Sequence, residues 1–73
     1  MEIRRVIAEE LALQEEPSLD ARFDLDLDCD SLDFVNILTR LETLTGVRIE
    51  PGTAREIQTV RDLVEYVEEW RKP

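Results

Sequence analysis

Apolar residues in three segments of this 73-residue chain lie three and four positions apart, the spacing of one face of an α-helix. The first segment predicts a helix over about residues 2–13, with Pro17 beyond its end. The second predicts a helix over about residues 31–44, followed by Gly46, which suits a helix C-terminus. The third predicts a helix over about residues 60–71.

The apolar faces of the last two helices follow from the same spacing. The face of the second is expected to contain Leu32, Val35, Leu38 (or Ile37), Leu41 and Leu44. The face of the last is expected to contain Val60, Leu63, Val64 and Val67. Thr59 is the expected N-cap of that helix. Trp70 continues the last face, so we expect it to cap the bundle.

The remaining segments connect these helices. Pro51-Gly52 is interpreted as a turn and residues 54–57 as one short helix. Residues 14–30 are expected to form an ordered loop, because aspartates disfavour a strand and no second strand is available to pair with it. The sequence therefore predicts an all-α fold, with residues 1–73 forming a single domain. Three main helices and one short helix would pack as a small bundle.

Charge and composition limit the classes of function. The chain has 18 acidic and 9 basic residues, a formal net charge of −9 that repels nucleic acid and anionic membranes. His, the commonest general base and metal ligand, is absent, so an enzyme is not expected. Cys29 has no partner for an internal disulfide, and no apolar run reaches the roughly 20 residues of a membrane span. We expect a cytoplasmic monomer.

Acidic residues gather before the second helix. Residues 15–33 hold eight acidic residues and one basic residue, and so −7 of the net charge. From Asp24 to Asp30 every second residue is Asp, as at the start of an EF-hand loop. That loop needs Gly at its sixth position and Glu at its twelfth, where this chain has Cys29 and Val35. We expect no EF-hand and no dedicated metal ligand, and interpret the stretch as a solvated acidic loop or a weak binder of divalent cations.

Ser31 follows Asp30 at the expected start of the second helix. Either side chain can serve as the N-cap, which is the simpler interpretation of these two residues. The same position also favours an anion, such as a phosphodiester on the Ser31 hydroxyl, because backbone N–H groups and the positive end of the helix dipole meet there. Without a His, a partner enzyme would have to supply the base that activates the hydroxyl.

A longer motif surrounds this pair. Phe23…Asp26-Leu27-Asp28-Cys29-Asp30-Ser31-Leu32-Asp33 resembles the prosthetic-group site of acyl carrier proteins, whose usual signature is Asp-Leu-Gly-x-Asp-Ser-Leu-Asp. Glu56-Ile57-Gln58-Thr59-Val60 resembles the short third helix of that family and the start of its fourth. Val47-Arg48-Ile49-Glu50-Pro51 resembles the segment after its second helix. The resemblance therefore extends over nearly the whole chain.

The resemblance implies a carrier without catalytic residues. A phosphopantetheinyl transferase would move 4'-phosphopantetheine from coenzyme A onto Ser31, and its thiol would carry an acyl group as a thioester. The pathway would be fatty-acid, polyketide or related specialised acyl metabolism. Further partners would be acyl ligase or synthase enzymes with basic docking surfaces. The second helix would be the recognition helix, with Asp30, Leu32, Asp33, Phe34, Val35 and Glu42 as the expected partner-binding residues.

The chain departs from the family pattern near this site. Asp28 stands where Gly is usual, and Asp tolerates a positive φ better than most residues. Cys29 is interpreted as a small packing residue, with a redox or cargo thiol as the alternative. Phe34 is expected to contact the arm or a partner beside Ser31, or else to pack against the last helix.

The second helix also lacks an acidic run typical of fatty-acid carriers. Asn36, Arg40, Thr43 and Arg48 occupy positions where acids are common. This difference favours a specialised partner set over the general fatty-acid enzymes. Two alternatives stay open: an aminoacyl or peptidyl carrier of a nonribosomal or amino-acid ligase pathway, and an acidic divalent-metal-binding or interaction module that never uses the arm.

Overall fold

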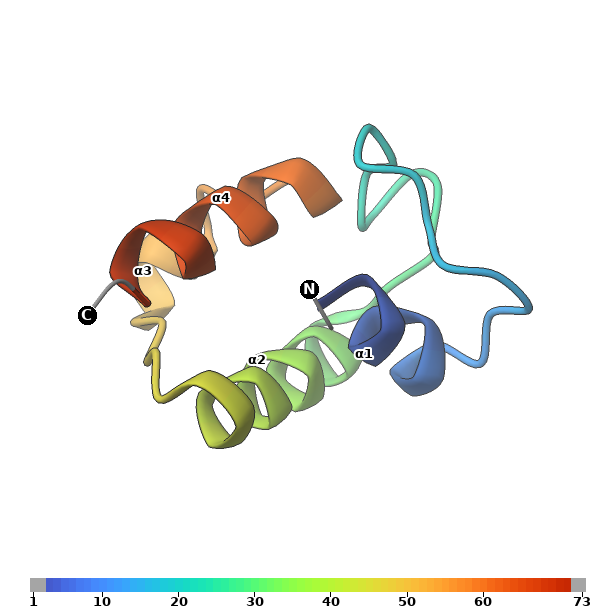
Figure 1. The fold of residues 1–73 in the computed structure, drawn as a ribbon. Coiled ribbons are helices and arrows are strands. Elements are labelled where there is room, and N and C mark those ends of the chain that lie inside the picture. Colours follow the sequence, from blue (N-terminus) through green and yellow to red (C-terminus); the bar gives the residue numbers. More distant parts are fainter. Residues whose placement is uncertain (1–2, 72–73) are drawn as a thin grey trace.

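The computed structural model describes residues 3–71 and contains four helices in the predicted order (Figure 1). They are α1 (Ile3–Glu10), α2 (Ser31–Thr45), α3 (Pro51–Ala54) and α4 (Val60–Trp70). The long segment between α1 and α2 lies at the right of Figure 1, and α3 is a short turn beside α4. The predicted all-α class is confirmed, and none of the described helices is long and apolar enough to cross a membrane.

The first helix is shorter than predicted. It ends at Glu10, whereas the apolar spacing suggested about residue 13, and residue 2 lies outside the described residues. The chain leaves the helix at Ala12, whose φ is +57°. The N–H of Leu13 donates to the carbonyl of Ala8 (2.8 Å) and that of Ala12 to Glu9 (3.3 Å), the pattern of a Schellman motif. These bonds satisfy the last carbonyls of α1 and stop it.

The prediction for the short helix is wrong by one turn. It was expected over 54–57 after a turn at Pro51-Gly52, but α3 is Pro51–Ala54 itself. Proline suits the first turn of a helix, because its φ is already helical and its missing N–H would have no partner there. The N–H of Ala54 donates to the carbonyl of Glu50 (2.9 Å), which closes the turn.

The buried face of α2 also differs from the predicted one. Ile37 and Leu41 are buried, but Leu32, Val35 and Leu44 are 69%, 55% and 57% exposed. The sequence of α2 contains two apolar stripes at helical spacing, and only one can face the core. The stripe that does so includes the partly buried Phe34 and Leu38. Gly46 ends α2 with a φ of +76°, as predicted.

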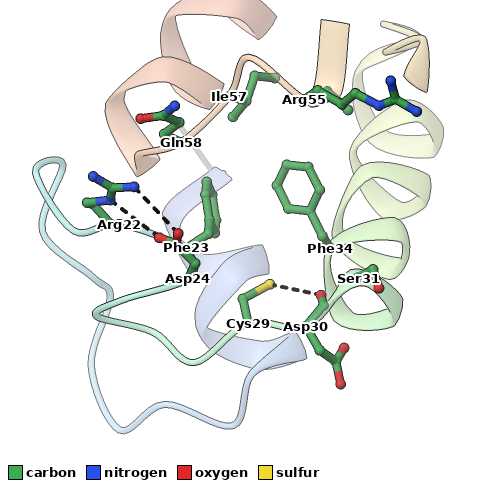
Figure 2. A pocket seen from close by; sticks show the side chains of 11 residues that line it. Arg22, Phe23, Asp24, Cys29, Asp30, Ser31, Phe34, Arg55, Ile57 and Gln58 are labelled. Carbon is green, nitrogen blue, oxygen red and sulfur yellow. Dashed lines mark hydrogen bonds and ion pairs between the residues drawn. The ribbon is translucent and has the colours of Figure 1, made fainter. Parts of the chain in front are cut away.

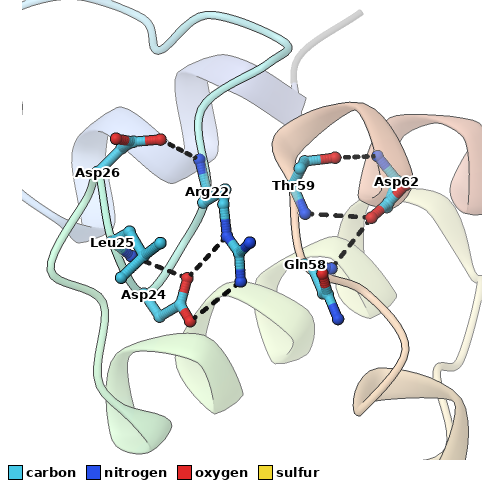
Figure 3. Close-up of polar contacts among 7 residues, drawn as sticks. All are labelled: Arg22, Asp24, Leu25, Asp26, Gln58, Thr59 and Asp62. Carbon is cyan, nitrogen blue, oxygen red and sulfur yellow. Dashed lines mark hydrogen bonds and ion pairs between the residues drawn. The ribbon is translucent and has the colours of Figure 1, made fainter.

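The last helix follows the prediction closely, except at its end. Thr59 is the N-cap, and it forms a capping box with Asp62 (Figure 3). Val60, Leu63 and Val67 are fully buried. Trp70 does not cap the bundle, because its side chain is 65% exposed.

Two sets of contacts place the remaining chain around this core. The loop after α1 is tied to the start of α4, since the N–H of Phe23 donates to the carbonyl of Gln58 (3.0 Å) and the N–H of Val60 to Ala21 (3.0 Å). Phe23 is buried, whereas Leu25 in the same loop is 73% exposed. The structure places no named helix or strand in residues 14–30, and an isolated bridge pairs Arg22 with Thr59.

Two ion pairs of one arginine join α1 to α2. The Arg40 guanidinium contacts a carboxylate oxygen of Glu9 at 2.7 Å and one of Glu10 at 3.0 Å. These two hydrogen bonds raise the pKa of Arg40 above its usual value. The positive charge of Arg40 is therefore bound to α1 instead of projecting alone from α2.

Candidate functional site

The first turn of α2 leaves the Ser31 hydroxyl exposed. Asp30 is the N-cap, and its carboxylate accepts a hydrogen bond from the N–H of Asp33 (2.8 Å). Of the two residues that the sequence offered as N-cap, Asp30 therefore caps the helix. Ser31 is the first helical residue, and its hydroxyl forms no hydrogen bond within residues 3–71. The oxygen is accessible to an incoming group.

The same turn retains capacity to bind an anion. In the part of the chain that the structure describes, the backbone N–H groups of Ser31 and Leu32 have no hydrogen-bond partner. Such N–H groups, together with the helix dipole, stabilise negative charge at a helix start. A phosphate attached to the Ser31 oxygen would be held close to both groups.

The residues before Ser31 shape the approach to the helix. Asp28 adopts a φ of +53°, so the position where the family usually has Gly does require left-handed backbone. The Cys29 thiol donates to the carbonyl of Asp30 at 3.5 Å (Figure 2). Burial, followed by the charges of Asp33 and Asp30, raises the pKa of Cys29 to about 11. This thiol stays protonated near neutral pH and is a poor nucleophile, which agrees with a packing role.

A pocket of about 320 Å³ adjoins Ser31 (Figure 2). Its apolar part is the pair of Phe23 and Phe34, whose rings meet edge to face with centroids 5.0 Å apart. Phe34 thus packs against the loop before α2 through Phe23, and it also contacts the core cluster to which α4 contributes. Polar side chains from the loop and from the segment after α3, including Arg22 and Gln58, line the rest.

The acidic loop is partly neutralised where it borders the pocket. Arg22 donates to both carboxylate oxygens of Asp24 (3.3 and 3.4 Å), and its backbone N–H donates to Asp26 (2.8 Å), as Figure 3 shows. The hydrogen bond from Arg22 is the main cause that holds the pKa of Asp24 below its usual value. Among residues 3–71, no three or more acidic or thiol side chains are placed to hold a metal ion. The carboxylates of Asp24, Asp26 and Asp30 accept hydrogen bonds from nearby N–H groups.

A second, larger cavity of about 530 Å³ lies between α2 and α3. Phe34, Val35, Leu38 and Ile49 supply apolar side chains to it, and Pro51 of α3 borders it. The volume falls in the range of about 300–1,000 Å³ that is typical of small-molecule sites. Phe34 lines both cavities, so the second begins next to the pocket beside Ser31.

The predicted partner-binding residues divide into two groups. Asp30, Leu32, Val35 and Glu42 are exposed on α2 or at its cap, and Asp33 is half-buried. Phe34 is half-buried against Phe23 and has less surface left for a partner. Leu32 and Val35 are the most exposed apolar residues of this set, and partner binding by the set stays a prediction.

Sequence reasoning missed the residues that come to Ser31 from elsewhere in the chain. Arg22, Arg55, Ile57 and Gln58 line the adjacent pocket, although three of them lie more than twenty residues after Ser31. Their position depends on how α3 and the following segment fold back on α2. No local pattern in the sequence indicates that arrangement.

Comparisons with known proteins agree with this fold and site. Residues 2–67 match the family described as "Phosphopantetheine attachment site". Acyl carrier proteins of Streptococcus pyogenes serotypes M3 and M1 are each 42% identical to the chain over 71 residues, which cover 96% of this chain and 92% of theirs. The solution structure of the acetyl actinorhodin acyl carrier protein of Streptomyces coelicolor superimposes with a TM-score of 0.77 at 28% identity, covering 96% of this chain and 86% of that one.

The fold and the matched domain define a small all-α carrier domain with a phosphopantetheine attachment site. The chain belongs to the acyl carrier protein family. It is therefore a non-catalytic carrier that bears phosphopantetheine as its prosthetic group.

Proposed function

We propose that residues 1–73 are a single carrier domain in which Ser31 bears the 4'-phosphopantetheine arm. The observation that carries this proposal is that the N-cap of α2 is Asp30 and not Ser31. Asp30 caps the helix, so the adjacent Ser31 hydroxyl is exposed and unbonded within residues 3–71. If Ser31 were the cap, its oxygen would be committed to a backbone N–H group.

Attachment would form a bond between the Ser31 oxygen and the phosphorus of phosphopantetheine. The bond from that phosphorus to the 3',5'-ADP part of coenzyme A would break, and the serine proton would pass to a base of the transferase. The unpaired N–H groups of Ser31 and Leu32 support this assignment, because they can stabilise the phosphodiester that results. The raised pKa of Cys29 leaves the arm's own thiol as the thioester-forming group.

The cargo we propose is an acyl chain of fatty-acid, polyketide or related specialised metabolism. Support comes from the cavity of about 530 Å³ between α2 and α3, whose apolar side chains include Leu38 and Ile49. An acyl chain buried there gains roughly 0.8 kcal/mol per CH₂ group. An aminoacyl group, the cargo of the alternative carrier class, has less apolar surface to bury.

The partners we propose are a phosphopantetheinyl transferase and acyl ligase or synthase enzymes with basic docking surfaces. Exposed Leu32 and Val35 offer apolar contact, and Asp30 and Glu42 offer negative charge around them. Exposed ion pairs contribute about 0–1 kcal/mol each, so docking is fast, weak and sensitive to salt. A specialised partner set is favoured because Arg40 leaves the middle of α2 with few acids.

Thiol titration after incubation with coenzyme A and a broad-specificity transferase tests the attachment. The apo-protein has one thiol, that of Cys29, so loading should raise the count to two per unfolded chain. Ser31→Ala should stay at one. The matched control is Ser18→Ala, which removes the other serine and should still reach two. A count of one for the wild-type chain, with a control carrier loaded in parallel, would contradict the proposal.

A further inference from the structure

A second surface with distinct chemistry lies between α3 and α4. It is a groove of about 330 Å³, which we call the aromatic groove, lined by Thr53, Glu56, Ile57, Asp62, Glu65, Tyr66, Glu69 and Trp70. Neither Ser31 nor any residue of α2 contributes to it. In Figure 1 the last turn of α4 lies at the left edge, whereas α2 starts near the middle.

The aromatic part of the groove is a pair of rings, of which Trp70 is exposed and Tyr66 is half-buried. Tyr66 and Trp70 are one helical turn apart on α4, with ring centroids 6.0 Å apart and planes inclined at 38°. Trp70 is 65% exposed, although a Trp side chain buries more apolar area than nearly any other when it packs in a core. Exposed Trp and Tyr side chains are the commonest anchors of protein interfaces.

The charged part of the groove is entirely negative. Four of its eight lining residues are acidic and none is basic. The Asp62 carboxylate is engaged in the capping box of α4, but the carboxylates of Glu56, Glu65 and Glu69 form no hydrogen bond or ion pair within residues 3–71. Glu65 also lies near enough to the Arg61 guanidinium for a Coulombic interaction, although Arg61 makes its ion pair with Asp20. A ligand that enters the groove therefore meets a π surface and unpaired negative charge together.

We propose that the aromatic groove binds an arginine-bearing segment of a partner protein. A guanidinium can stack on the indole face of Trp70 and donate to the surrounding carboxylates at the same time. A lysine ammonium has no planar face to stack and is more strongly hydrated, so it fits less well. This contact goes beyond the proposed function, because it needs neither Ser31 nor the arm and leaves α2 accessible to a second enzyme.

Fluorescence offers a direct probe, because Trp70 is the single Trp of the chain. The probe is a capped, alanine-based helical peptide with arginines four positions apart, compared at low salt with its lysine counterpart. We expect a saturable change of Trp70 emission and tighter binding of the arginine peptide. Equal affinity of the two peptides would overturn the stacking proposal.

Matched variants separate the groove from the general negative charge of the protein. Glu69→Gln removes a groove carboxylate, whereas Glu68→Gln removes the same charge from the neighbouring position of α4, which does not line the groove. Calorimetry should show about two- to fivefold weaker binding for Glu69→Gln and for Trp70→Leu, as exposed cation–π contacts allow. Equal weakening by Glu68→Gln and Glu69→Gln would overturn the proposal.

Three further measurements complete the test. Ser31→Ala should bind the arginine peptide as the wild-type chain does, so that failure of the arm attachment and failure of the groove are distinguishable. Sedimentation velocity identifies the other occupant, a second copy of this chain. Self-association that Trp70→Leu abolishes would overturn the partner proposal, and a monomer at all concentrations supports it. Circular dichroism checks that each variant keeps its helices.

Discussion

Helices α2 and α4 have similar apolar content but use it differently. In α4 the residues Val60, Leu63 and Val67 are fully buried, and a capping box fixes the first turn. In α2 only Ile37 and Leu41 are buried. The longer helix thus gives fewer buried side chains to the core than its length would allow, because Leu32, Val35 and Leu44 face outwards.

We propose that α4 serves as a structural helix and α2 as the helix that partners recognise. Apolar side chains that stay exposed on a small acidic protein are available to partners, and the exposed face of α2 begins next to Ser31. Helix α4 instead stabilises the fold. Its first residue and the segment before it also hold the loop that leads to the site, through backbone hydrogen bonds with Ala21 and Phe23. We expect substitutions in the two helices to separate stability from carrier function.

The largest effect is expected from truncation of the core. Leu63→Ala should lower the free energy of unfolding by about 2–5 kcal/mol, because the side chain is fully buried and leaves a cavity. Leu32→Ala should change it by less than about 0.5 kcal/mol, since Leu32 is 69% exposed. Urea denaturation measures both values.

Arm transfer should show the reverse order for these variants. Leu32→Ala should slow the transferase, whereas residual folded Leu63→Ala should be loaded normally. Comparable losses of stability for Leu32→Ala and Leu63→Ala would show that α2 also contributes its outer face to the fold.

The two N-caps give the next largest effect. Thr59→Ala and Asp30→Ala should each lower the stability by about 1 kcal/mol, or roughly 4–8 °C in melting temperature, because each releases a backbone N–H group. Asp30→Asn should keep the cap and the melting temperature, yet slow arm transfer by removing a charge beside Ser31. If Asp30→Asn lowered the melting temperature as much as Asp30→Ala, the carboxylate charge would be required for the cap itself.

A smaller effect is expected on the stability of the protein at acid pH. The backbone N–H groups of Gln58 and Thr59 donate to the Asp62 carboxylate and hold its pKa below the usual value. The hydrogen bond from Gln58 is the largest cause. The resulting stability is present above the unfolded pKa of about 3.9 and is lost as the pH falls through the lower folded pKa. Asp62→Asn should therefore flatten the fall of melting temperature below about pH 4. An unchanged acid slope in this variant would show that the carboxylate of the capping box contributes no stability.

The smallest effect is expected from salt. Residues 15–33 carry −7 of the net charge with Arg22 included, and the ion pairs of Arg61 with Asp20 and of Arg5 with Glu16 compensate only part of it. Added sodium chloride or magnesium should raise the melting temperature by less than the roughly 4–8 °C that correspond to 1 kcal/mol. A flat or falling melting temperature would mean that the fold already compensates the acidic loop fully.

The sequence predicted those features that depend on local chemistry. The αL stop at Gly46, the Thr59 cap and the buried face of α4 follow from single residues or one clear spacing. It could not choose between the two apolar stripes of α2, because the choice depends on where Phe23 and α1 pack. It also missed that Arg40 binds α1, since a pair between residues thirty positions apart leaves no local signal.

The central claim is that Ser31, left unbonded by the Asp30 cap, receives the arm. Mass spectrometry of proteolytic fragments after co-expression with a phosphopantetheinyl transferase tests it most directly. The account predicts one phosphopantetheine group per chain, on the fragment that contains Ser31, and none in Ser31→Ala. An unmodified chain alongside a fully modified control carrier, or an arm on the fragment with Ser18, would contradict it.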